Sequence, residues 1–76
     1  MSLETLKELQ TSGKFHHATY RNEGTVWEGL YVYQYDATQP RGFSLAFAFN
    51  KQSNPEEMEE AMKLVKGVSV GSYGNG

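Results

Sequence analysis

The sequence predicts one small α+β domain with element order α-β-β-β-α(-β). It would be built as an antiparallel three- to four-stranded sheet with two helices on one face. Three observations lead to this class. Amphipathic segments lie toward both ends, three segments rich in β-branched and aromatic residues lie between them, and turn-forming residues occur at the junctions. A length of 76 residues fits a single domain over 1–76, with residues 74–76 expected to fray.

The first helix is predicted over residues 3–10. Leu3, Leu6 and Leu9 recur at helical spacing, Ser2 is suited to cap the N-terminus, and Gly13 is a C-terminal stop. A helix this short is marginal in water, so it must pack against the rest of the domain.

Strands are predicted over residues 15–21, 25–35 and 42–50. The second is the strongest, because nearly all of its residues are β-branched or aromatic, and the third alternates large apolar with small or polar residues. Residues 22–24 are predicted to form a three-residue hairpin loop ending in Gly24, and residues 36–41 form a second loop.

The second helix is predicted from Pro55 to about residue 66. Asn54 is placed to cap it, and Glu57 has the spacing of a capping box. One stripe of this helix is apolar: Met58, Ala61, Met62 and Val65. Gly67 would end the helix, and residues 68–73 could add a short last strand.

This element order is similar to that of double-stranded-RNA-binding domains. Those domains place a lysine-rich cluster at the start of the last helix, where it meets phosphate. This chain has acids at the matching positions: Glu56, Glu57, Glu59 and Glu60. The resemblance therefore predicts topology alone.

Strand alternation divides the expected sheet into two faces. A hairpin at residues 22–24 pairs Thr19 with Trp27, and pairing Tyr35 with Phe43 sets the second hairpin. One face then collects Phe15, Trp27, Tyr31, Tyr33, Tyr35, Phe43, Leu45, Phe47 and Phe49. The other collects His16, Ala18, Tyr20, Val26, Glu28, Leu30, Val32, Ser44, Ala46 and Ala48.

Two helices can cover only one of these faces. The aromatic face is the expected core, which leaves the small-residue face as an interaction face formed by Ala18, Tyr20, Leu30, Val32, Ala46 and Ala48. The reverse assignment stays open. In that case Trp27, Tyr31 and Tyr33 would form an open aromatic platform for bases or peptides.

Composition limits the partners and the compartment. A net charge of −2 and a pI near 5.6 argue against nucleic acid as the partner. No apolar run is long enough to cross a bilayer, and the first residues show no secretory signal, so no membrane partner is expected. The absence of cysteine favours a reducing, cytoplasmic location.

No catalytic motif, metal site or cofactor site is predicted. His16 and His17 are adjacent in a strand, so their side chains should point to opposite faces and could not chelate one ion. His16, Glu28 and Tyr20 fall on one predicted face, and a small enzyme built around His16 and Glu28 is an alternative.

The sequence thus favours a non-enzymatic interaction module. It would form a homodimer, or act as a small regulator or inhibitor of a larger protein, of the kind that phages and mobile elements carry. The runner-up is a nucleic-acid or small-ligand binder that uses the aromatic platform.

Overall fold

A computed structural model describes residues 2–21, 28–65 and 69–71. Its elements are α1 (Ser2–Ser12), β1 (Phe15–Arg21), β2 (Gly29–Tyr35), β3 (Phe43–Asn50), α2 (Pro55–Leu64) and β4 (Ser69–Gly71). The predicted α+β class and the order α-β-β-β-α are confirmed. Val26, Trp27 and Gly67, the turn predicted at 22–24 and the tail predicted at 74–76 lie outside the described residues.

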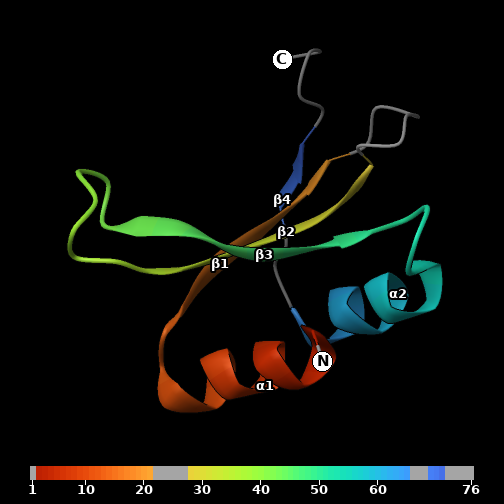
Figure 1. Ribbon diagram of the computed structural model, residues 1–76, viewed down its shortest axis with the longest axis horizontal. Coiled ribbons are helices and arrows are strands. Elements are labelled where there is room, and N and C mark those ends of the chain that lie inside the picture. Colours follow the sequence, from red (N-terminus) through yellow and green to blue (C-terminus); the bar gives the residue numbers. More distant parts are fainter. Residues whose placement is uncertain (1, 22–27, 66–68, 72–76) are drawn as a thin grey trace.

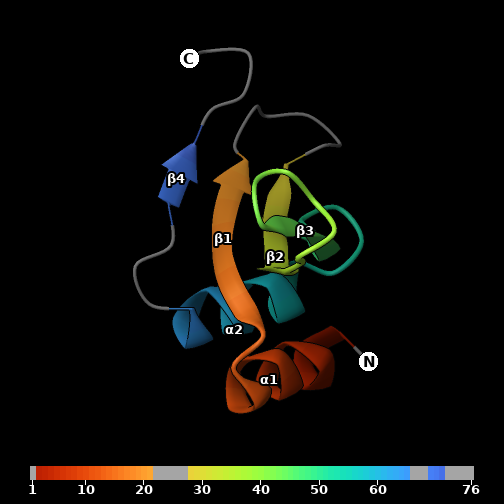
Figure 2. The ribbon, with the colours of Figure 1, turned by 90° about the vertical axis from the view of Figure 1, so that its left-hand side faces the viewer.

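The described strands form one sheet in the order β3-β2-β1-β4, with both helices on the same side of it (Figures 1 and 2). β1, β2 and β3 are antiparallel neighbours, as predicted. β4 pairs with β1 in parallel, so the expectation of an antiparallel fourth strand is wrong. The connection through α2 brings β4 back to the edge occupied by β1.

The register of the first hairpin differs from the prediction. Arg21 pairs with Gly29 and Thr19 with Tyr31, four residues further along β2 than expected. Because four is an even number, this shift leaves every side chain of β2 on its predicted face. Gly29 suits its position, since a Cβ there would collide with the backbone carbonyl oxygen of Phe49.

Two β-bulges change the faces of the other strands. Between Phe15 and His17 the register shifts, so His16 is the extra residue of β1. In β3 the pairing moves from Tyr33–Leu45 to Val32–Phe47, which makes Ala46 the extra residue there. Each bulge reverses the side-chain alternation on one side of itself. Phe15, Phe47 and Phe49 are therefore turned away from the tyrosines of β2, contrary to the prediction.

The core lies between the sheet and the helices. Its buried members are Leu6, Leu9, Ala18, Leu30, Val32, Phe49, Met58, Ala61 and Val65. Phe15, Tyr20, Ala46 and Phe47 are partly buried and pack against it. The helices thus cover the small-residue face, and the preferred assignment of the sequence analysis is wrong.

The physical reason lies in which aromatic residues share a face. After the bulges, the phenylalanines Phe15, Phe47 and Phe49 join the core, while the outer face keeps mainly tyrosines and histidines. Tyrosine and histidine rings carry polar atoms that can reach water, so leaving them uncovered costs less than exposing phenylalanine. The small side chains of Ala18 and Val32 also let the helices approach the sheet.

The helix ends follow the sequence in part. Gly13 terminates α1 with φ of 78°, in the left-handed region that glycine adopts readily, and Lys14 N donates to Leu9 O at 2.9 Å. Asn54 occupies the N-cap position of α2 but makes no side-chain capping hydrogen bond, contrary to the prediction. Neither of these two described helices has the length and apolarity needed to cross a membrane.

Candidate functional site

The predicted interaction face has no open surface. Ala18, Leu30 and Val32 are at most 3% exposed beneath the helices, and Tyr20 and Ala46 pack against the same core. Ala48 is exposed, but the β3 bulge places it on the opposite face, paired with Tyr31. This set of residues was predicted to share an uncovered face, and that prediction is wrong.

The outer face of the sheet carries a group of aromatic rings that the helices leave uncovered. We call the aromatic surface the set His16, His17, Tyr33, Tyr35 and Phe43. Tyr33 and His17 are opposite each other in the β1–β2 ladder, and their rings stack with centroids 4.6 Å apart and an interplanar angle of 3°. The Phe43 ring contacts both of them edge-on, at 5.7 Å from Tyr33 and 4.8 Å from His17.

One end of the aromatic surface is exposed to solvent, and an exposed apolar side chain lies beside the surface. Tyr35 is 61% exposed, and its ring meets that of His16 edge-on at 4.6 Å. Leu45, beside Tyr33 in the β2–β3 ladder, is 50% exposed. Tyr31 lies further along the same face of β2. Of the predicted platform, Tyr31 and Tyr33 are therefore on the uncovered face, and Trp27 lies outside the described residues.

The bulge brings the two histidines together. His16 and His17 lie on the same side of β1, and their Nδ1 atoms are 2.7 Å apart, within hydrogen-bonding distance. The expectation that these neighbours point to opposite faces is wrong, because it assumed regular alternation. Burial is the main cause that lowers the pKa of His17, and the neighbouring His16 lowers it further. His17 therefore stays neutral to a lower pH than an ordinary histidine.

A hollow of about 470 Å³ adjoins the aromatic surface, a size that is typical of small-ligand sites. It is lined by Tyr33, Gln39, Pro40, Arg41, Phe43, Ser44 and Leu45. The β2–β3 loop that forms one wall is held by Asp36, whose carboxylate accepts hydrogen bonds from the backbone and hydroxyl of Thr38. These bonds lower the pKa of Asp36, with the Thr38 hydroxyl as the largest cause.

Two arginines lie over aromatic rings of the outer face. The guanidinium of Arg21 is 6.0 Å from the centroid of Tyr31, and that of Arg41 is 5.8 Å from the centroid of Phe43. Both distances are within the range of cation–π contacts. β1, β2 and β3 contain no aspartate or glutamate.

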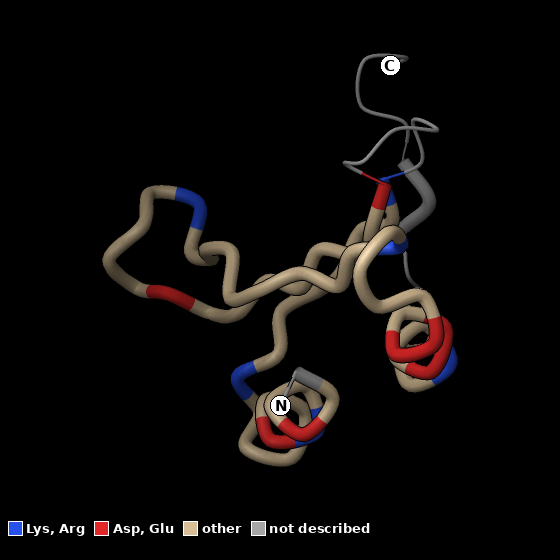
Figure 3. Tube along the Cα trace, turned by 45° about the vertical axis from the view of Figure 1, so that its right-hand side comes forward, with Lys and Arg blue, Asp and Glu red and all other residues tan. Residues whose placement is uncertain are grey.

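Charge is distributed unevenly over the molecule (Figure 3). The two helices carry six acidic and two basic residues, whereas the described strands and loops carry four basic and two acidic residues. The net charge of −2 therefore arises mainly from the helix layer. The described strands and loops have a small excess of basic residues, although one of these residues, Lys14, lies beside α1 on the helix side.

A polar cluster lies at the C-terminal end of β1, away from the aromatic surface. Tyr20 OH donates a hydrogen bond to the carboxylate of Glu28, which is 8% exposed, and Lys51 Nζ is 3.2 Å from the same carboxylate oxygen. The bond to Glu28 is the main cause that raises the pKa of Tyr20 to about 12. Bonding to Tyr20, aided by Lys51, lowers the pKa of Glu28.

The enzyme alternative needed His16 and Glu28 in one site. His16 lies at the start of β1, against Tyr35 and Phe43, whereas Glu28 precedes Gly29, which pairs with Arg21 at the end of β1. The structure therefore separates this pair and joins Glu28 to Tyr20 and Lys51 instead. Within the described ranges, no group of three or more potential metal ligands occurs.

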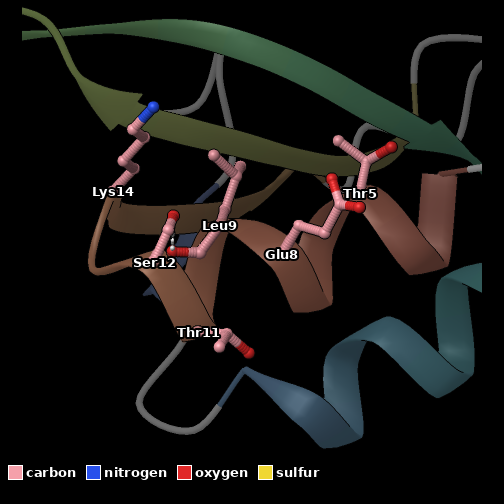
Figure 4. A pocket seen from close by; sticks show the side chains of 6 residues that line it. All are labelled: Thr5, Glu8, Leu9, Thr11, Ser12 and Lys14. Carbon is pink, nitrogen blue, oxygen red and sulfur yellow. Dashed lines mark hydrogen bonds between the residues drawn. The ribbon is translucent and has the colours of Figure 1, made fainter.

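Another hollow, of about 440 Å³, lies on the helix side beside α1 (Figure 4). Residues of α1 and Lys14 line it: Thr5, Glu8, Leu9, Thr11, Ser12 and Lys14. Figure 4 shows Leu9 and Lys14 directed toward the sheet and Thr11 directed away from it. This hollow is therefore mostly the side of a single helix, and it does not connect with the aromatic surface.

Sequence reasoning missed His16, His17 and Arg41 as members of the site, whereas Tyr35 and Phe43 were assigned to the aromatic face but not to the platform. The ring-rich composition of the strands was visible, but the bulges that decide which rings share a face leave no clear local signal. Comparison of the chain with protein-family models, with curated proteins and with solved structures finds no match.

Proposed function

We propose that this protein is a binding module for single-stranded nucleic acid, with the outer face of its sheet as the binding surface. The supporting observation is an uncovered sheet face on which stacked rings, a hollow and two arginines lie together. Proteins that bind single-stranded nucleic acid commonly combine two kinds of side chain: aromatic side chains that stack with bases and basic side chains that contact phosphates.

The rings supply the part of the binding that does not depend on charge. His17 covers one face of the Tyr33 ring and holds it in place, and Tyr33 and Leu45 both line the hollow, which is where a base would stack. Stacking of one base on an aromatic side chain is worth about 1–3 kcal/mol. Bases in a duplex already stack on each other, so an intact duplex should bind weakly.

The arginines supply the electrostatic part. Arg21 and Arg41 flank the rings, and the strands between them bring no carboxylate to the surface. The acidic helices lie on the other side of the sheet, where they would face away from a bound strand (Figures 1 and 3). For this reason the negative net charge, which argued against nucleic acid, carries less weight than the distribution of charge.

The same distribution disfavours pairing of two copies through this face. A face-to-face homodimer would bring Arg21 and Arg41 of both copies into a contact whose strands contain no acid. Placing like charges opposite each other across an interface costs binding free energy. An anionic partner with flat rings meets both features of the surface at once. The homodimer of the sequence analysis stays a prediction, and the binding experiment includes it as an outcome.

Fluorescence anisotropy with a labelled single-stranded oligonucleotide tests the proposal. Tyr33→Leu should weaken binding by about 1–3 kcal/mol, because it keeps an apolar side chain but removes the stacking ring. With two phosphate contacts, the logarithm of the affinity should fall with the logarithm of salt concentration at a slope of about −1.4.

A pair of charge variants gives the matched control. Arg41→Ala should reduce the steepness of the salt dependence by about 0.7, since it removes one phosphate contact. Lys63→Ala removes the same charge from the helix layer and should leave binding unchanged. Equal effects of the two variants, or unchanged binding by Tyr33→Leu, would contradict the proposal. A dimer in light scattering that Leu45→Glu dissociates, without oligonucleotide binding, would assign the face to self-association.

A further inference from the structure

The two histidines of the β1 bulge have a geometry that the proposed function does not use. Their Nδ1 atoms approach to 2.7 Å, and both rings are half-buried. His16 and His17 are the only histidines of the chain, which contains no cysteine. A pair of converging imidazole nitrogens is a chelating arrangement for transition metal ions, which imidazole binds well.

Neighbouring rings fix the orientation of the pair. His17 is stacked on Tyr33, and His16 meets Tyr35 edge-on with centroids 4.6 Å apart. Phe43 contacts both imidazoles, at 4.6 Å from His16 and 4.8 Å from His17. These contacts hold the two nitrogens in place in the absence of metal, which lowers the entropic cost of binding.

The separation of the nitrogens distinguishes between metal geometries. Metal–nitrogen bonds are about 2.0 Å long, so two ligands at right angles have nitrogens about 2.8 Å apart, and tetrahedral ligands about 3.3 Å apart. The observed 2.7 Å, which is also an ordinary hydrogen-bond length, is closer to the right-angle value than to the tetrahedral value. Right angles belong to the square-planar or tetragonal sites that Cu²⁺ and Ni²⁺ prefer, and not to the tetrahedral sites of Zn²⁺.

We infer that His16 and His17 form a two-nitrogen chelating site for Cu²⁺ or Ni²⁺ on the outer face of the sheet. Both ligands bind through Nδ1 as neutral imidazoles that carry their proton on Nε2. In the free protein one of the two imidazoles donates its Nδ1 proton to the Nδ1 of the other. When the metal binds, that proton leaves Nδ1 through water and the free Nε2 of the same ring takes up a proton, so both rings stay neutral. Described residues supply no third histidine or carboxylate within the group, so water fills the remaining positions.

Titration with Cu²⁺ alone, followed by electron paramagnetic resonance, tests this site without any oligonucleotide. The wild type should bind one ion with hyperfine structure from two imidazole nitrogens. His16→Gln and His17→Gln should each weaken binding by about tenfold or more, because loss of even a supporting partner of a ligand costs about 10–100-fold. Circular dichroism would check that the variants are folded.

The double variant His16→Gln/His17→Gln measures binding by the amino terminus and other background groups. Cu²⁺ binding that is unchanged in the double variant would overturn the inference, as would a wild-type spectrum with fewer than two imidazole nitrogens. Zn²⁺ binding as tight as that of Cu²⁺ would overturn the square-planar assignment. Because no nucleic acid is present, each of these results leaves the proposed function to its own test.

Discussion

At the scale of single residues, Tyr20 and Glu28 show how a polar pair stabilises one end of the sheet. Glu28 is 8% exposed and has two partners, the hydroxyl of Tyr20 and the ammonium group of Lys51. The backbone of Lys51 also donates to Glu28 O at 3.0 Å. These bonds tie the start of β2 to β1 and to the end of β3.

The Tyr20–Glu28 pair predicts two pH dependences of stability. The pKa of Tyr20 is raised from 10.0 to about 12, so the folded state holds this proton more tightly than the unfolded chain. Stability from this source is complete below pH 10 and is lost as the pH rises toward 12. The pKa of Glu28 is lowered from 4.5, so its contribution is present above pH 4.5 and lost as the pH falls through the folded-state pKa.

Tyr20→Phe tests both dependences. Absorbance of tyrosinate in the folded wild type should show one tyrosine that titrates near pH 12, and this titration should be missing from the variant. The variant should also be less stable at neutral pH, with a weaker loss of stability between pH 10 and 12. A variant that retains the late-titrating tyrosine would show that the shift belongs to another residue.

At the scale of elements, the two β-bulges determine which surface of the sheet is left open. The type and order of the elements could be predicted, because the leucine and methionine stripes, Gly13 and Pro55 are local signals. The side-chain faces could not. Each bulge depends on pairing with β2, and a shift of one residue turned Phe47 and Phe49 from the predicted aromatic face into the core.

The candidate site was predictable to the same limited extent. Tyr31 and Tyr33 were correctly predicted to share a face, since side chains alternate regularly along this part of β2. His17 was not recognised as their neighbour, because the shift at His16 depends on how Phe15 packs against the core. The loop with Arg41 was visible as a loop, but its position against Phe43 is a tertiary contact.

A matched pair of leucine substitutions tests the assignment of faces. Leu30 is 0% exposed and belongs to the core, whereas Leu45 on the outer face is 50% exposed. Leu30→Ala should reduce the free energy of unfolding by about 2–5 kcal/mol. Leu45→Ala should cost less than about 1 kcal/mol, since most of the side chain is already in water. Urea denaturation of both variants measures the difference.

Two results would contradict this assignment. Equal costs for Leu30→Ala and Leu45→Ala would mean that the outer face is also buried in solution, as in a dimer. A larger cost for Leu45→Ala would restore the assignment that the sequence favoured. Measurement at several protein concentrations separates these cases, because the stability of a dimer depends on concentration.

At the scale of the whole molecule, the fold has two chemically different sides. The helix layer carries most of the acids (Figure 3), and the outer face of the sheet carries the rings with Arg21 and Arg41. A uniform net charge of −2 would repel a nucleic acid equally from all sides. With this polarity, a strand approaching the sheet meets attraction at close range, while screening at physiological salt limits repulsion from the helices beyond about 8 Å.

The central claim is that the aromatic surface is where the partner binds. The most direct test is an NMR titration of the isotopically labelled protein with a short single-stranded oligonucleotide. We expect the shifted resonances to gather on the outer face, at His17, Tyr33, Phe43 and Leu45, and those of α2 to stay unchanged. Shifts that gather on the helices, or a spectrum without saturable change, would contradict it.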